Sequence, residues 1–126
     1  MNRSTTLFLC GLVCTAAQVS VASPIVELVW SSDGRFQHQA QVAPGKFAEI
    51  CGKLAEGASV RWKFDSSGPT DFNIHYHVGK EVVYPVKRSQ AAAAEGVLAA
   101  SIPQDYCWMW TNKGTQSIRI QVELAR

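Results

Sequence analysis

Two histidines spaced two positions apart have the clearest potential for chemistry in this sequence of 126 residues. Asn73, His75 and His77 alternate with the apolar residues of segment 72–78, so the three polar side chains are expected on one face of a strand. Residues two apart in a strand lie about 7 Å from each other, close enough for both imidazole rings to reach one transition-metal ion. The spacing therefore allows a His-x-His site for copper, or less readily for zinc. The alternative, which we favour, is a hydrated or hydrogen-bonded pair that holds no metal.

A metal site would need a third ligand, and the sequence offers three kinds. Met109 is a thioether ligand suited to copper, and His38 or a reduced cysteine are the other candidates. Packing of Met109 against bulky rings in the core explains this residue without a metal. A copper site that uses Cys107 would require a reduced thiol, so it excludes a disulfide to Cys51.

Tyr106, Trp108 and Trp110 share one face of a second expected strand, residues 105–111. Neither face of this strand carries many polar residues, so we expect it to be central and covered on both sides. The three rings could form a platform on which a sugar ring or an apolar peptide side chain stacks. Packing in the core is the simpler interpretation and the one that we favour.

The sequence shows no pattern typical of catalysis. No spacing singles out a nucleophile with its base, a pair of convergent carboxylates or a glycine loop that would hold a phosphate, and we therefore expect no enzymatic activity. The 12 Lys and Arg residues nearly balance the 10 Asp and Glu residues, and the charges are scattered. This balance argues against nucleic acids and anionic membrane surfaces as partners.

Residues 1–22 have the features of a secretory signal peptide. Arg3 supplies a positive charge, residues 7–17 are mostly apolar, and Ser20 and Ala22 place small residues where a signal peptidase reads them. The apolar stretch is shorter than the roughly 20 residues that cross a bilayer, so we expect cleavage after Ala22 and no transmembrane anchor. Residues 23–126 would then form a single domain in the periplasm or outside the cell.

Removal of the leader would leave two cysteines, Cys51 and Cys107. In an oxidising compartment, an even pair in a small domain is most simply explained by one disulfide bond. Ligation of a metal ion by the two thiolates is the alternative.

Alternating apolar and polar residues predict strands along most of the remaining chain. In the last segment, residues 116–124, the even-numbered positions are apolar from Ile118 onward, which predicts one buried face and one solvent face. Residues 89–95, with four consecutive alanines, could instead form a helical turn or two that Gly96 would end. About seven to nine strands joined by turns predict an all-β, antiparallel β-sandwich. The expected strands are 26–30, 36–42, 60–64, 72–78, 81–86, 96–102, 105–111 and 116–124, with turns at 33–34, 44–45, 68–69, 79–80 and 113–114.

The order of these features resembles the GOLD domain, the β-sandwich of the p24 family of secretory-pathway proteins. The likeness spans residues 40–125 and includes Cys51, segments 60–64 and 71–78, the run from Asp105 to Asn112, and an alternating last strand. In that family an early cysteine pairs with one in a segment similar to the one around Tyr106 and Cys107. The resemblance therefore implies a GOLD-like or jelly-roll-like sandwich stapled by a Cys51–Cys107 disulfide, here as an isolated exported version without the family's coiled coil and membrane span.

Together these features predict an exported, non-catalytic binding or interaction module of the cell envelope. Its partner would be a protein or a small ligand, and no cofactor is expected. The alternative function is that of a periplasmic metal-binding protein that uses His75, His77 and Met109 to hold copper.

Overall fold

Seven strands and no helix make up the part of the chain that the structure describes. The computed structural model describes residues 23–126, and the expected signal peptide lies outside these residues. Within the described range no helix is long and apolar enough to span a membrane. The strands are β1 (Ile25–Glu27), β2 (Arg35–Val42), β3 (Phe47–Leu54), β4 (Ser59–Val78), β5 (Glu81–Ala99), β6 (Gln104–Thr111) and β7 (Ile118–Ala125).

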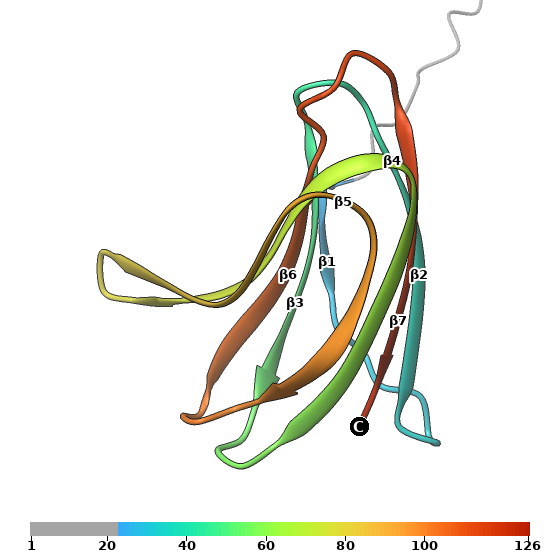
Figure 1. The fold of residues 1–126 in the computed structure, drawn as a ribbon. Coiled ribbons are helices and arrows are strands. Elements are labelled where there is room, and N and C mark those ends of the chain that lie inside the picture. The colour runs from blue at the N-terminus through green and yellow to red at the C-terminus, as the bar shows by residue number, and fades with distance from the viewer. Residues whose placement is uncertain (1–22) are drawn as a thin grey trace, which may run out of the picture.

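The strands form one sheet that curls into two layers, which share the long strands β4 and β5 (Figure 1). The order along the sheet is β1-β3-β6-β4-β7-β2, with β5 paired to β4. β4 pairs with β7 through residues 61–66 and with β6 through residues 71–75. The expected all-β sandwich is therefore confirmed. It is not wholly antiparallel, because β1 and β3 pair in parallel.

The length of β4 and β5 differs from the expectation. Segments 60–64 and 72–78 belong to one strand, and the Gly68-Pro69 pair lies inside β4 instead of reversing the chain. The four alanines at 91–94 lie within β5, so the expected helical turn is wrong. Ala91 and Ala94 are paired with Thr70 and Phe64 of β4. Pairing along a neighbouring strand thus overrides the helix propensity of alanine.

The bend that carries β4 and β5 from one layer to the other is fixed by side-chain contacts. The Thr70 hydroxyl is buried and donates to the Thr111 carbonyl over 2.9 Å. Asp71 accepts hydrogen bonds from both the backbone and the side-chain nitrogen of Gln90, whose φ of 49° is unusual for a residue other than glycine. The Lys113 ammonium, 2.6 Å from Asp71, lowers the pKa of that carboxyl group, and the Gln90 backbone N–H adds to the effect.

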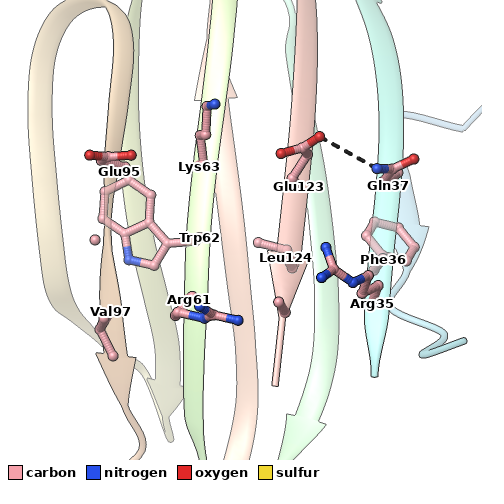
Figure 2. Close-up of a pocket in the computed structure, with 12 residues that line it drawn as sticks. Arg35, Phe36, Gln37, Arg61, Trp62, Lys63, Glu95, Val97, Glu123 and Leu124 are labelled. Carbon is pink, nitrogen blue, oxygen red and sulfur yellow. Dashed lines mark hydrogen bonds between the residues drawn. The ribbon is translucent and has the colours of Figure 1, made fainter. Parts of the chain in front are cut away.

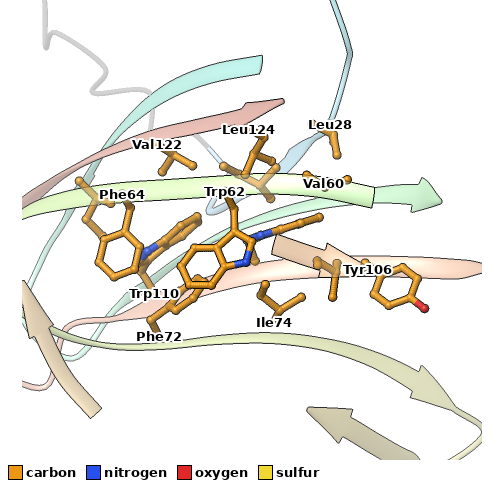
Figure 3. Packing of buried hydrophobic residues seen from close by; sticks show 14 of the residues in the cluster. Leu28, Val60, Trp62, Phe64, Phe72, Ile74, Tyr106, Trp110, Val122 and Leu124 are labelled. Carbon is orange, nitrogen blue, oxygen red and sulfur yellow. The ribbon is translucent and has the colours of Figure 1, made fainter. Parts of the chain in front are cut away.

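Aromatic and branched side chains fill the space between the two layers (Figure 3). Tyr106, Trp108 and Trp110 are at most 1% exposed, so they belong to the core. The alternative of an aromatic binding platform is therefore wrong, because no ring face is open to a ligand. The expected burial of alternate residues in the last strand is confirmed. Ile118, Ile120, Val122 and Leu124 of β7 are all buried.

Trp62 packs directly over a glycine of the neighbouring strand. Gly96 is the partner of Trp62 in the β4–β5 pairing. A Cβ atom at Gly96 would lie 2.7 Å from Trp62 Cζ2, closer than such atoms approach in proteins. Glycine is therefore required here by contact with the indole ring, and not by its backbone angles.

We predict that Gly96→Ala destabilises the protein by about 1–3 kcal/mol, because the added methyl group must displace the buried indole. Urea unfolding followed by tryptophan fluorescence measures this change. Val97→Ala, one position further along β5, is the matched control, since Val97 is exposed. The control should change stability by less than about 0.5 kcal/mol. Equal unfolding free energies for Gly96→Ala and wild type would contradict the proposed contact.

Candidate functional site

Three neighbouring strands bring a group of polar and sulfur-containing side chains together on the outer face of one layer. Glu49 of β3 is opposite Met109 of β6, and Met109 is opposite Asn73 of β4. In the next row, Cys51 is opposite Cys107, which is opposite His75. Cys51 and Cys107 form a disulfide bond, so the expected pairing is confirmed. We call the group Glu49, Asn73, His75 and the disulfide the outer cluster.

His75 is the central residue of the outer cluster, and it is nearly buried. Its side chain is 7% exposed and that of Glu49 is 12% exposed. His75 Nε2 lies 3.2 Å from Glu49 Oε1, and His75 Nδ1 lies 2.7 Å from Asn73 Oδ1. Both ring nitrogens therefore have an oxygen neighbour. These contacts hold the imidazole in one orientation against the sheet.

Burial opposes charge on both members of the Glu49–His75 pair. Desolvation lowers the pKa of His75, and the nearby His77 lowers it further. Desolvation also raises the pKa of Glu49, although the charge of His77 acts in the opposite direction. With His75 Nδ1–H donated to Asn73, Glu49 and His75 Nε2 can share one proton along the 3.2 Å contact. The contact is thus better described as a hydrogen bond within a buried pair than as a surface salt bridge.

His75, His77 and Met109 share one face of the sheet, whereas the fourth candidate metal ligand, His38, does not. The rings of His75 and His77 lie 5.3 Å apart, so the expected common face is confirmed. Met109 lies on this face between Glu49 and Asn73, one row away from the disulfide. His38 lies on β2 in the other layer, opposite Val122. The structure therefore places Glu49, and not His38, beside the two histidines.

Ligation by a cysteine thiolate is excluded by the disulfide. Within residues 23–126, one set of three ligand-type side chains has its ligand atoms within 4.8 Å of one another, namely Glu49, Cys51 and Cys107. Because the two sulfurs are bonded to each other, they supply no thiolate. A site on this face would have to rely on imidazole nitrogens, the Glu49 carboxylate and the Met109 thioether. A copper or zinc site at His75, His77 and Met109 stays a prediction.

Glu49 is the functional candidate that sequence reasoning missed. It lies far from His75 in the sequence and belongs to no motif. A usable signal was nevertheless present, because Glu49 is two residues before Cys51 and a strand places both on one face. Once Cys51 is joined to Cys107, β3 lies beside β6, and the Glu49 side chain is on the face that carries the disulfide. β6 is in turn next to β4, the strand that carries His75.

Beyond the outer cluster, β4 and β5 continue as a two-stranded arm that projects from the sandwich (Figure 1). We define the arm as residues 76–84. It carries an unusual share of exposed apolar surface: Val78 is 50% exposed, Val82 37%, Val83 36% and Tyr84 44%. Tyr84 connects the arm to the outer cluster, because its ring lies 5.9 Å from that of His75. The Lys87 ammonium covers the Tyr84 ring at 4.1 Å.

Comparison with known proteins identifies similar folds but no family. No family model matches this chain. No curated protein matches its sequence. The fold is similar to that of the Yersinia pseudotuberculosis-derived mitogen, with a TM-score of 0.58 and 8% sequence identity over 74% of this chain and 86% of the mitogen. It is also similar to the pre-peptidase C-terminal domain of a Bacillus anthracis collagenase, with a TM-score of 0.57 and 9% identity over 82% of this chain and 98% of that domain.

A third similar structure is PliG from Aeromonas hydrophila, a periplasmic inhibitor of g-type lysozyme. Its TM-score is 0.52, with 13% identity over 80% of this chain and 94% of PliG. At these identities the likeness extends to the fold alone. None of the three structures is described as a GOLD domain, and that resemblance stays a prediction.

The lowered pKa of His75 predicts a specific pH dependence of stability. The folded state resists protonation of His75, whereas the unfolded chain takes up the proton near pH 6.5. Stability is therefore lost as the pH falls from about 6.5 through the lowered pKa. We expect the unfolding free energy to decrease less in His75→Gln than in wild type between about pH 7.5 and pH 5.

His38→Gln is the control for this measurement, because His38 lies in the other layer. Urea unfolding at each pH gives the slope of the unfolding free energy against pH for each protein. Glu49 titrates in the opposite sense, since its raised pKa stabilises the fold at low pH, but it is present in all three proteins. If the unfolding free energy of His75→Gln fell as steeply with decreasing pH as that of wild type, the assignment of this pH dependence to His75 would be contradicted.

Proposed function

We propose that the protein is an exported, non-catalytic binding module of the cell envelope that holds a protein partner through the arm. The observation that carries this proposal is the exposed apolar surface of Val78, Val82, Val83 and Tyr84 on an element that projects from the sandwich. Val82 and Val83 pair with His77 and Tyr76, so the exposed apolar side chains lie on both faces of the arm. Apolar surface left exposed on a small domain is typical of interaction sites.

The arm is suited to binding because its base is already ordered. Asp71 precedes the arm on β4, and it holds that part of the strand to Gln90 of β5 and to Lys113 of the β6–β7 connection. A partner therefore meets a fixed surface, and little conformational entropy is lost on association. Lys80, Glu81, Lys87 and Arg88 are exposed and flank the apolar residues in the sequence, so the charge around the arm is net positive. The matching surface on the partner would be apolar with an acidic rim.

Export is supported by the disulfide and by the expected signal peptide. A disulfide in a small domain persists in oxidising compartments such as the periplasm. Two similar structures, PliG from Aeromonas hydrophila and from Salmonella Typhimurium, are periplasmic inhibitors of g-type lysozyme. Their fold likeness supports a lysozyme as the first partner to test. A GOLD-like topology of the sandwich is part of the same proposal.

A role in binding also accounts for the chemistry of the outer cluster. Glu49 and His75 could in principle act as an acid and a base, but the Cys51 sulfur, 3.5 Å from Glu49, is held in the disulfide. A bonded sulfur is no nucleophile. We propose that the pair serves to fix the face from which the arm projects.

We predict that the double variant Val82→Ser/Val83→Ser binds the partner about tenfold or more weakly, since it removes an apolar contact from each face of the arm. The first probe is purified g-type lysozyme, with affinity measured by calorimetry. Val29→Ser is the matched control, because Val29 is 66% exposed and lies outside the arm. Equal losses in both variants would contradict binding through the arm.

Partners other than lysozyme are sought by photo-crosslinking in the envelope of living cells. A benzophenone amino acid at position 84 should give one dominant adduct, which mass spectrometry identifies, and the same group at position 29 should give none. The adduct should disappear in the double variant. Adducts of equal yield from both positions would count against the arm as the binding surface.

A periplasmic metal-binding function is the second candidate, and the adjacent rings of His75 and His77 beside Glu49 favour it. The donor set of two nitrogens and one carboxylate oxygen suits zinc or copper(II). We predict that a bound ion would be lost in His77→Gln and retained in His38→Gln, as measured by calorimetric titration with each metal. Failure of the wild-type protein to bind either ion would remove this candidate.

A further inference from the structure

The outer face of the other layer contains a shallow groove of about 580 Å³. Four strands form its floor: β5, β4, β7 and β2 (Figure 2). The groove is separate from the arm and the outer cluster, since its lining comes from residues 35–37, 61–63, 95–97 and 123–125. Its side chains are arranged in rows across the four strands, and these rows differ in net charge.

One row holds two arginines with only a methyl group between them. Arg61 of β4 is opposite Ala125 of β7, which is opposite Arg35 of β2. Figure 2 shows the two guanidinium groups reaching toward β7 from its two sides. Because strands lie about 4.8 Å apart, the backbones of the two arginines are about 10 Å apart, a span that both long side chains can close over one small group.

The neighbouring row carries one positive and two negative side chains. Lys63 is paired with Glu95 on one side and with Glu123 on the other. The Gln37 amide also donates to Glu123 over 3.4 Å. These carboxylates therefore have positive or hydrogen-bonding neighbours in their own row.

The row of Arg61, Ala125 and Arg35, the arginine row, contains no carboxylate. Within the described residues, Arg61 takes part in no ion pair. Arg35 has one contact, from Nε to Asp33 at 3.7 Å, and both of these side chains are about two-thirds exposed. An exposed pair of this length contributes little, so it leaves the positive charge of the row largely uncompensated.

We infer that the arginine row is a binding site for a small organic carboxylate, held between Arg35 and Arg61 over Ala125. Two guanidinium groups offer paired N–H donors that match the two oxygens of a carboxylate. Glu95 and Glu123 in the next row disfavour a dianion such as phosphate. Val97, opposite Arg61 and 61% exposed, provides an apolar wall for the carbon chain of the ligand.

The test is a titration of the ¹⁵N-labelled protein with butyrate, followed by the amide resonances. Butyrate should shift the amides of residues 35–37, 61–63 and 123–125 in a saturable way, and added salt should weaken its binding. Butylammonium, which has the same chain and the opposite charge, should cause no such shifts. Phosphate should bind more weakly than butyrate.

Three variants distinguish binding between Arg35 and Arg61 from a general effect of positive charge. Arg61→Gln should weaken butyrate binding about tenfold, since it removes charge-assisted hydrogen bonds. Ala125→Leu keeps both charges but fills the gap, so it should also weaken binding. Arg119→Gln, on the same strand but outside the groove lining, should bind as wild type does.

Amide spectra that superimpose away from the groove establish that each variant is folded, and Arg35→Gln replaces Arg61→Gln if that variant is not. Unchanged butyrate affinity in the arginine variant would overturn the inference. An equal loss in Arg119→Gln, or tighter binding of phosphate or butylammonium than of butyrate, would also overturn it.

Discussion

The pairing of β4 with two different strands along one of its edges is the constraint on which the rest of the fold depends. Its first half pairs with β7 and its second half with β6, while β5 follows it on the other side. β4 must therefore bend and twist between residues 65 and 72, where the pairing with β5 shifts register. Proline at position 69 suits this segment, because it has no N–H to contribute to a ladder. The buried Thr70 hydroxyl supplies a hydrogen bond to β6 at the same point.

This bend determines where each candidate site lies. The first half of β4 carries Arg61 and Lys63 on its outer face, and these residues line the groove. The second half carries Asn73 and His75 on its outer face, and these residues form the outer cluster with β3 and β6. The inner faces of both halves contribute to one core, in which the rings of Phe64 and Phe72 lie 4.8 Å apart. One strand thus fixes two outward surfaces relative to each other through a shared interior.

Local sequence patterns predicted the strands well where one face of the strand is buried and the other is exposed to solvent. β7 is the best example, because Ile118, Ile120, Val122 and Leu124 all face the core as their alternation indicates. The patterns failed where a strand has a bend or an exposed edge. Gly68 and Pro69 are typical turn residues, and the alanines at 91–94 favour a helix locally, yet both segments are held in strands by pairing between β4 and β5. Such pairing is a long-range interaction that no local window contains.

The candidate sites differ in the same way, because local patterns predict one of them and not the other. The common face of His75 and His77 follows from period-two alternation, and it was predictable. The groove was not, because Arg35, Arg61 and Ala125 are distant in sequence and meet only through strand register. No spacing along the chain distinguishes these arginines from other exposed basic residues.

The Glu49–His75 pair connects the arm to the disulfide-linked part of the sheet. The Tyr84 ring of the arm lies 5.9 Å from the His75 ring, and the other side of His75 contacts Glu49, two residues from Cys51. A charge on His75 would need water in a place from which burial excludes it, and the half-exposed Tyr84 ring covers one side of this place. Neutral His75 therefore allows Tyr84 to pack against it. By this argument the lowered pKa of His75 is a consequence of the packing that holds the base of the arm in place.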